Sequence, residues 1–392
     1  MQKFNFDEVI ERRNTLSVKY GLIEKIFGRE DVIPMWVADM DFRVPECVSS
    51  AIKNRADHKI YGYSYHPVSF FQSAKEWVKK RHDWGVDLNW LSFSPGIVPG
   101  INFSVLEFTE PGDKIMIQPP VYAPFFHAIR KNNRQLVENR LILKNGRYHI
   151  NFDDFENHLK TGVKMFILSN PHNPGGNVWT HDELKKMGEL CLEYNTIIIA
   201  DEIHSDIVYP GFRYIPMASI SEAIANNTIT FISPSKTFNI AGLSASIGII
   251  SNKEFRTRFN TMLDRLHMGN GNLFGTVAFE AAYKYGEEWL DQLLLYLEGN
   301  IVFLSDYFEK NIEGIKLIRP EGTFLAWLDC RELPVPDNEI HSFMIEKAKV
   351  AFNDGAGFGE NGEGFQRLNF GCSRYTLSKA LYNMKNALLR NH

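Results

Sequence analysis

The residue with the clearest capacity for covalent chemistry is a lysine that follows a buried strand. Residues 228–232 (TITFI) are β-branched or aromatic and predict a short strand, which Ser233, Pro234 and Ser235 separate from Lys236. If that strand is central, Lys236 lies at the carboxyl edge of the sheet, where open α/β folds bind ligands. Burial there disfavours the ammonium form, so the amine could condense with an aldehyde while the two serines hold a phosphate. This combination indicates pyridoxal phosphate; the alternative is a loop lysine without a chemical role.

Polar side chains also follow the two predicted strands that come before this one. Residues 164–169 (KMFILS) predict one strand, and the NPHNPGG sequence after it contains Asn173. Residues 196–200 (TIIIA) predict the next, with Asp201 directly after it and His204 three positions further on. Strand, helix and strand in succession indicate parallel strands with right-handed crossovers, whose carboxyl ends share one edge. We therefore expect Asn173, Asp201 and Lys236 to converge.

Pyridoxal chemistry requires a lysine, an acid beside the ring nitrogen, a phosphate cradle and a cation for the substrate carboxylate. An ionised Asp201 would favour the pyridinium form, which withdraws the electrons left at Cα after proton loss. Asn173 is the candidate partner of the ring hydroxyl, and His204 is the candidate to assist Asp201. Arg367 lies within a predicted strand, residues 365–370, where its charge requires a partner such as a substrate carboxylate. Taken singly, Asp201 is equally explained as a helix cap, His204 as a core histidine and Arg367 as part of a structural ion pair.

The phosphate and the cofactor ring have candidate contacts of their own. Residues 92–100 (SFSPGIVPG) predict a turn into a helix, whose first N–H groups are free to bind a phosphate; an ordinary helix cap is the alternative. Tyr122 follows the strand predicted at residues 114–118 and offers a flat face to an aromatic ring. The predicted phosphate cradle consists of Gly96, Ile97, Val98, Ser233 and Ser235.

The strand and helix pattern predicts an α/β fold of two domains. We expect a large cofactor-binding domain at residues 46–290, with a mostly parallel central sheet and helices on both faces. A smaller α+β domain is expected from residues 1–45 and 291–392, with a long helix at residues 287–310 as the connector. Residues 32–42 (VIPMWVADMDF) look like a segment laid across the body of the protein, and their pattern assigns them no role. Asp39 within them is counted, with Arg367 and Asn173, as a candidate substrate-binding residue.

The composition excludes several classes of protein. With 392 residues, 44% apolar, 23% charged and a net charge of -4, the chain is ordinary for a soluble enzyme and unlike a nucleic-acid-binding protein. Its polar first residues and the absence of an apolar run of about 18 residues predict a cytoplasmic protein without a membrane segment. The four cysteines are scattered, which predicts reduced thiols and neither a disulfide framework nor a metal site.

These residues occur in motifs that resemble a known superfamily over essentially the whole chain. NPHNPGG (170–176), ADEIH (200–204), SPSKTFNIAGL (233–243) and RLNFGC (367–372) resemble the motifs of the fold-type I pyridoxal-phosphate enzymes of the class I/II aminotransferase superfamily. WVADMDF (36–42), YGYS (61–64) and PPVY (119–122) make the chain more similar to the cystathionine β-lyase-like carbon–sulfur lyases. That group includes a bacterial modulator of the maltose regulon.

The resemblance implies a homodimer with active sites shared across the interface. Tyr63 would reach the phosphate in the neighbouring subunit, Tyr122 would stack on the ring and Lys236 would carry the Schiff base. Many aminotransferases have an arginine eight residues after the lysine, where this chain has Ser244, and a tyrosine in the place of His204. The carbon–sulfur lyase group also lacks that arginine, so the departure at Ser244 favours the lyase branch.

The activity implied by the resemblance is α,β-elimination of L-cystathionine or related S-substituted cysteines to a thiol, pyruvate and ammonia. Two alternatives remain open at this stage. One is a pyridoxal-phosphate-dependent aminotransferase, because the residue pattern alone does not forbid returning the proton to the cofactor. The other is a regulatory protein that modulates a transcription factor and keeps the fold. The sequence does not select among the possible sulfur-containing substrates.

Overall fold

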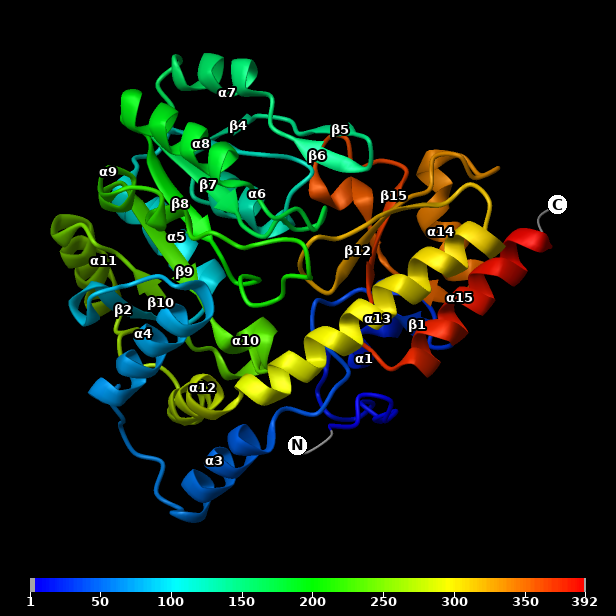
Figure 1. The fold of residues 1–392 in the computed structure, drawn as a ribbon, viewed down its shortest axis with the longest axis horizontal. Coiled ribbons are helices and arrows are strands. Elements are labelled where there is room, and N and C mark those ends of the chain that lie inside the picture. The colour runs from blue at the N-terminus through cyan, green and yellow to red at the C-terminus, as the bar shows by residue number, and fades with distance from the viewer. Residues whose placement is uncertain (1–3, 391–392) are drawn as a thin grey trace.

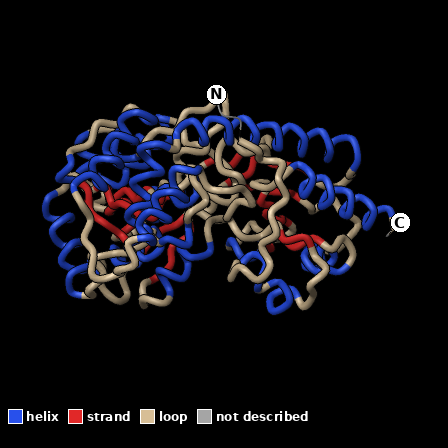
Figure 2. The backbone as a smooth tube through the Cα atoms, turned by 90° about the horizontal axis from the view of Figure 1, so that it is seen from below, coloured by secondary structure: helices blue, strands red, loops and turns tan. Residues whose placement is uncertain are grey.

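The computed structural model describes residues 4–390, which contain a seven-stranded central sheet and a separate four-stranded sheet. Figure 2 shows the strands gathered in two groups, each surrounded by helices. In the central sheet the strand order is β2-β10-β9-β8-β7-β3-β4. Its strands are β2 (Leu91–Ser94), β3 (Lys114–Ile117), β4 (Gln135–Glu138), β7 (Met165–Ser169), β8 (Ile197–Asp201), β9 (Thr228–Ile232) and β10 (Ser246–Ile249).

The central sheet is mostly parallel, as the alternation of strands and helices predicts. Strands β4, β3, β7, β8 and β9 pair in parallel, and β10 runs antiparallel to both β9 and β2. The register pairs Ser169 with Asp201, and Asp201 with Phe231, so the carboxyl ends of β7, β8 and β9 lie level. Polar residues that follow these strands therefore meet at one edge of the sheet.

Helices cover both faces of this sheet (Figure 1). They are α4 (Val68–His82), α5 (Ile97–Phe108), α6 (Ala123–Arg130), α7 (Phe152–Leu159), α8 (His181–Glu193), α9 (Glu222–Asn226), α11 (Lys253–Arg265) and α12 (Leu273–Tyr285). Helix α3 (Glu46–Asp57) packs against α12.

The side chains of β8 alternate between two hydrophobic clusters because successive residues of a strand point to opposite faces. Ile198 packs with Leu184 and Met187 of α8, whereas Ile199 packs with Ile101 of α5. The capping box predicted at the start of α8 is present: the Glu183 N–H bonds the Thr180 hydroxyl, and the Glu183 carboxylate accepts from the Thr180 N–H.

The second sheet is antiparallel and has the order β11-β12-β15-β14. Helix α13 (Glu287–Asn311) runs from the central-sheet region along this part of the protein (Figure 1), as the apolar periodicity predicts. The other elements here are β11 (Lys316–Ile318), β12 (Leu325–Asp329), α14 (Ile340–Glu346), β14 (Asn353–Asp354), β15 (Phe365–Asn369) and α15 (Arg374–Leu389).

The N-terminal residues join this second part of the protein. Strand β1 (Ile33–Pro34) pairs in parallel with β13 (Val350–Ala351), and the short helices α1 (Val18–Gly21) and α2 (Ile23–Phe27) precede it. This pairing places residues near 33 beside the C-terminal part. The expected domain boundaries, 46–290 against 1–45 with 291–392, stay a prediction. Among residues 4–390, no helix is both long and apolar enough to cross a membrane.

Two features of the fold were not expected from the sequence. Lys236 does not lie in a loop: it belongs to a four-residue helix, α10 (Pro234–Thr237), whose first turn Ser233 caps. Along the chain, a separate hairpin of β5 (Ile142–Lys144) and β6 (Arg147–His149) comes between the central strands β4 and β7. Its strands have only three residues each, too short for a period-two pattern to stand out.

Candidate active site

A cavity of about 270 Å³ lies at the shared carboxyl edge of β7, β8 and β9. Asp201 is the last residue of β8, and its Oδ1 accepts a hydrogen bond from the Ile203 N–H at 3.2 Å. The Asn173 N–H donates to the Ser169 hydroxyl at 3.2 Å, which fixes the turn after β7. The predicted site residues that line this cavity are Gly96, Ile97, Val98, Tyr122, Asn173, Asp201, His204, Ser235 and Lys236.

The amine and the carboxylate of the cavity have pKa values shifted in opposite directions by burial. The pKa of Lys236 is lowered to about 8, mainly by burial; Asp39 and Asp201 act to raise it, and Arg367 acts with burial to lower it. Burial raises the pKa of Asp201 to about 6, against the Ile203 hydrogen bond and the Lys236 charge. At pH 7 about a tenth of Lys236 is therefore the neutral, nucleophilic amine, far more than for an exposed lysine, while Asp201 is mostly ionised. Opposed shifts of this kind cluster at functional sites.

Arg367 is a buried cation that the protein leaves partly unsatisfied. Its Nη1 donates to Asn173 Oδ1 at 3.1 Å, and its Nη2 donates to the Trp36 carbonyl at 2.8 Å and to Asn353 Oδ1. Its Nε is buried without a partner, and no carboxylate of the described residues forms an ion pair with it. Arg367 is thus not part of a structural ion pair, which was the alternative. A buried N–H of a cation is costly to leave unpaired, and an incoming carboxylate would satisfy it.

The start of α5 forms one end of the cavity. Gly96 has φ 151° and ψ 162°, a conformation that is essentially restricted to glycine. The N–H groups of Ile97 and Val98 in the first turn have no partner within the helix, and Pro99 has no N–H to offer. Such a helix start is suited to a phosphate.

The two serines before Lys236 have different positions. Ser235 lines the cavity. Ser233 does not: its hydroxyl donates to the Ala245 carbonyl at 2.8 Å and accepts from the Ser235 N–H at 3.1 Å. It therefore holds the start of α10 in place, and its direct contact with a phosphate stays a prediction.

His204 lines the cavity as a neutral imidazole, because burial lowers its pKa well below the ordinary value. Its Nδ1 is buried without a hydrogen-bond partner among residues 4–390, and its ring packs edge-on to Phe324 with the centroids 5.8 Å apart. The unpaired nitrogen distinguishes it from a satisfied core histidine.

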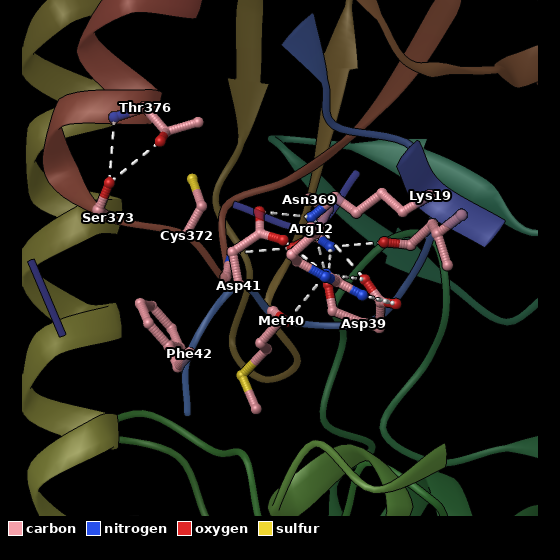
Figure 3. A network of polar contacts seen from close by, with 12 residues as sticks. Arg12, Lys19, Asp39, Met40, Asp41, Phe42, Asn369, Cys372, Ser373 and Thr376 are labelled. Carbon is pink, nitrogen blue, oxygen red and sulfur yellow. Dashed lines mark hydrogen bonds and ion pairs between the residues drawn. The ribbon is translucent and has the colours of Figure 1, made fainter. Parts of the chain in front are cut away.

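Besides Arg367 and Ser233, two further predicted site residues do not line the cavity. Tyr63 is fully exposed, in the segment between α3 and α4, so any contact with a phosphate requires a second subunit. The Asp39 carboxylate points to Arg12 (Figure 3), with its two oxygens 3.0 and 2.8 Å from the guanidinium nitrogens. The roles expected for Tyr63 toward a partner and for Asp39 toward substrate stay predictions.

Comparison with known proteins decides the family. The family described as aminotransferase class I and II matches residues 30–383. The chain belongs to this family. Among its relatives, the cystathionine beta-lyase PatB of Bacillus subtilis is 43% identical over 98% of this chain and 100% of its own. Cystalysin from Treponema denticola, which contains a pyridoxal 5'-phosphate cofactor, is 35% identical with a TM-score of 0.96 and full coverage of both chains. The PLP-bound C-S lyase from Staphylococcus hominis is 37% identical with a TM-score of 0.92, covering 99% of each chain.

Sequence reasoning missed several contacts of the site in this family member. Ala38 lines the cavity, and its carbonyl accepts a hydrogen bond from Lys236 Nζ at 2.6 Å. Ser244, noted in the sequence only as a departure from the aminotransferase pattern, also lines it. A main-chain carbonyl carries no signal in side-chain chemistry, and Ala38 is distant in sequence from Lys236. Only the motif around residues 36–42 could have drawn attention to it.

Proposed function

We propose that the chain is a pyridoxal-phosphate-dependent carbon–sulfur β-lyase. It converts L-cystathionine, or related S-substituted cysteines, to a thiol, pyruvate and ammonia. One observation supports this above all: the Lys236 amine and the Asp201 carboxylate line the same cavity in a chain 43% identical to a cystathionine beta-lyase. Without that juxtaposition the lysine would have no acid partner for the cofactor ring.

The residues of the cavity fit pyridoxal phosphate. The amine, the carboxylate and the helix start provide three of the four groups that this chemistry requires. Arg367, which bonds the cavity residue Asn173 and keeps a buried, unpaired Nε, would provide the fourth. We assign the residues as follows: Lys236 to the aldehyde, Asp201 to the ring nitrogen with His204 beside it, Asn173 to the ring hydroxyl, Tyr122 to the ring face, and Gly96, Ile97, Val98 and Ser235 to the phosphate.

When bound, the cofactor supplies an aldehyde and a ring that withdraws electrons from Cα of the substrate. The protein supplies the proton transfers and the orientation. Lys236, with a pKa of about 8, is suited to remove the Cα proton near neutral pH. Arg367 and Asn173 hold the substrate carboxylate, which fixes the direction of the Cα–H bond. The leaving thiol has an ordinary pKa of about 8.5, which makes it a far better leaving group than an alkoxide.

Incubation with L-cystathionine in the absence of any keto acid tests this proposal against the aminotransferase alternative. We expect pyruvate and free thiol to accumulate over many turnovers. A single stoichiometric burst that then stops would contradict a lyase. The Lys236→Ala variant should lose the reaction while keeping its fold, which near-ultraviolet circular dichroism would show.

The proposal includes a homodimer in the cytoplasm. The segment between α3 and α4 carries three exposed tyrosines, Tyr61, Tyr63 and Tyr65, which suits it to contact a second copy of the chain. In that arrangement Tyr63 would donate to the phosphate in the neighbouring subunit. The four cysteines are free of disulfides, which agrees with a reducing compartment.

A further inference from the structure

Residues 36–42, to which the sequence pattern assigned no role, form a strap beside Lys236. Almost every carbonyl of the strap accepts a hydrogen bond from a side chain elsewhere in the protein. The donors, in order, are Arg367 to Trp36, Asn369 to Val37, Lys236 to Ala38, Asn369 and Lys19 to Asp39, Asn239 and Arg12 to Met40, and Asn239 to Phe42.

Four of the donor side chains come from two segments on either side of the strap, β15 and the region of α10. Arg367 and Asn369 are two residues apart on β15, so both point to the same side of that strand. Lys236 lies in α10, and Asn239 lies two residues after the end of that helix. The Asn239 Oδ1 also accepts from the Met40 N–H at 2.9 Å. The strap therefore connects the predicted carboxylate-binding arginine with the segment that carries the reactive lysine.

Ion pairs fix the end of the strap (Figure 3). The Asp41 carboxylate lies 2.6 Å from Arg12 and 2.8 Å from Lys19, and the Lys19 side chain is only 1% exposed. The Asp41 N–H donates to the Gly371 carbonyl at 2.8 Å. Buried, paired charges of this kind are strongly destabilising to break, so the strap has one defined position.

The strap also lies between the site cavity and a second, larger cavity. Ala38, Lys236 and Ala241 line both the cavity of about 270 Å³ and a neighbouring one of about 570 Å³. Displacement of the strap would open a route for water between the two. Burial is the largest cause of the lowered pKa of Lys236, so access of water would raise that pKa. The charged groups around the amine are Asp39 on the strap, Asp201 on β8 and Arg367 on β15, and the neutral His204 follows β8.

We propose that the strap of residues 36–42 positions the Lys236 amine and shields it from water, and that Asn239 and Asn369 are the positioning residues that hold the strap. The inference rests on the proposed function only in taking Lys236 as the reactive amine. The Ala38 carbonyl gives that amine a fixed place whenever it is free, and the shield keeps about half of it neutral at pH 8.

Two variants remove independent anchors of the strap. Asn239→Gly deletes the three hydrogen bonds to Met40 and Phe42, and glycine tolerates the φ of 59° at this position. Asn369→Ala deletes the bonds to Val37 and Asp39 from the other side. Asn195→Gly is the matched control, because it places a glycine at a φ of 53° on the turn between α8 and β8.

The readout is the titration of Lys236 in the full chain without cofactor. A short pulse of acetic anhydride at a series of pH values, followed by peptide mass spectrometry, gives the midpoint at which Lys236 becomes reactive. We expect a midpoint near 8 in the unmodified chain and the control, and a rise of about 1 or more in both strap variants. A rise of 1 lowers the neutral fraction at pH 8 about fivefold, and kcat of the holoenzyme at that pH should fall similarly while KM changes little.

An unchanged midpoint in both strap variants, with near-ultraviolet circular dichroism showing a native fold, would overturn the proposal. Failure of both variants to fold would also overturn it, because the two asparagines would then be structural residues. The labelling uses neither cofactor nor substrate, so its result does not depend on whether the chain is a lyase. A chain that shows the predicted midpoints but releases no thiol would refute the proposed function and leave the strap assignment intact.

Discussion

The binding of the substrate carboxylate by Arg367 gives the sharpest test of the proposed site. We expect Arg367→Gln to weaken turnover of substrates that carry a carboxylate far more than turnover of substrates that lack one. In the structure, the guanidinium donates to Asn173, Trp36 and Asn353, and its buried Nε has no partner in the part of the chain that the structure describes. A substrate carboxylate is the group that would complete this set of bonds.

The magnitude follows from the burial of the arginine, whose exposed fraction is 4%. Loss of one partner from a buried, hydrogen-bonded charge pair costs about 2–5 kcal/mol. At about 1.36 kcal/mol for each factor of ten, kcat/KM should fall between about 30-fold and several thousandfold. Part of this loss would come from the Trp36 carbonyl, because Arg367 also anchors the strap.

A thermodynamic cycle that combines the Arg367 substitution with a change of substrate separates the carboxylate contact from the effect on the strap. The assay measures kcat/KM of the unmodified chain and the variant with S-benzyl-L-cysteine and with its carboxamide, which has no carboxylate. Displacement of the strap should affect both substrates equally, so the coupling energy isolates the carboxylate contact. We expect a coupling of at least about 2 kcal/mol. Arg147→Gln is the control, because Arg147 pairs with Glu183 and Glu321 away from the cavity.

Equal losses for the two substrates would refute the assignment of Arg367 to the carboxylate. The arginine would then act only through the strap and Asn173. A coupling of similar size in the Arg147 control would show that the cycle reports general destabilisation, and the reasoning from the unpaired Nε would lose its support.

Three further predictions concern stability and the cofactor. Burial raises the pKa of Asp201 from 3.8 to about 6 in the cofactor-free fold, so ionisation of this carboxyl makes the fold less stable as pH rises from about 4 to 6. Asp201→Asn should therefore stabilise the cofactor-free chain by up to about 3 kcal/mol at pH 8, measured by urea unfolding. A gain in stability that does not shrink toward pH 5 would contradict this. In Gly100→Ala the added Cβ would lie 2.5 Å from the Phe231 ring, so the free energy of unfolding should fall by about 1–3 kcal/mol. Gly21→Ala is the control: its Cβ would meet no atom within 4 Å, so its free energy of unfolding should not fall. Tyr63→Phe should weaken cofactor binding by about tenfold or more in equilibrium dialysis without changing the oligomeric state, and unchanged affinity would exclude a bond from Tyr63 to the phosphate.

The sequence predicted the central elements of the fold closely. Strand β9 has the predicted bounds of 228–232, and β7 and β8 differ from their predicted ranges by a single residue at one or both ends. Strongly apolar, β-branched runs bounded by Pro, Asn and Ser give this precision because such runs are stable only inside a sheet. The convergence of Asn173, Asp201 and Lys236 followed from the same pattern, since parallel strands bring their carboxyl ends to one edge.

The tertiary structure alone decided what lies across that edge. The contact of Lys236 with the Ala38 carbonyl and the bonds from the two asparagines that hold the strap join residues 198 to 332 positions apart. Local periodicity records which face of an element is buried, but it does not record which distant segment covers it. The sequence therefore determined the chemistry of this protein. The packing of residues 36–42 against α10 and β15 determined the environment that holds Lys236 and lowers its pKa.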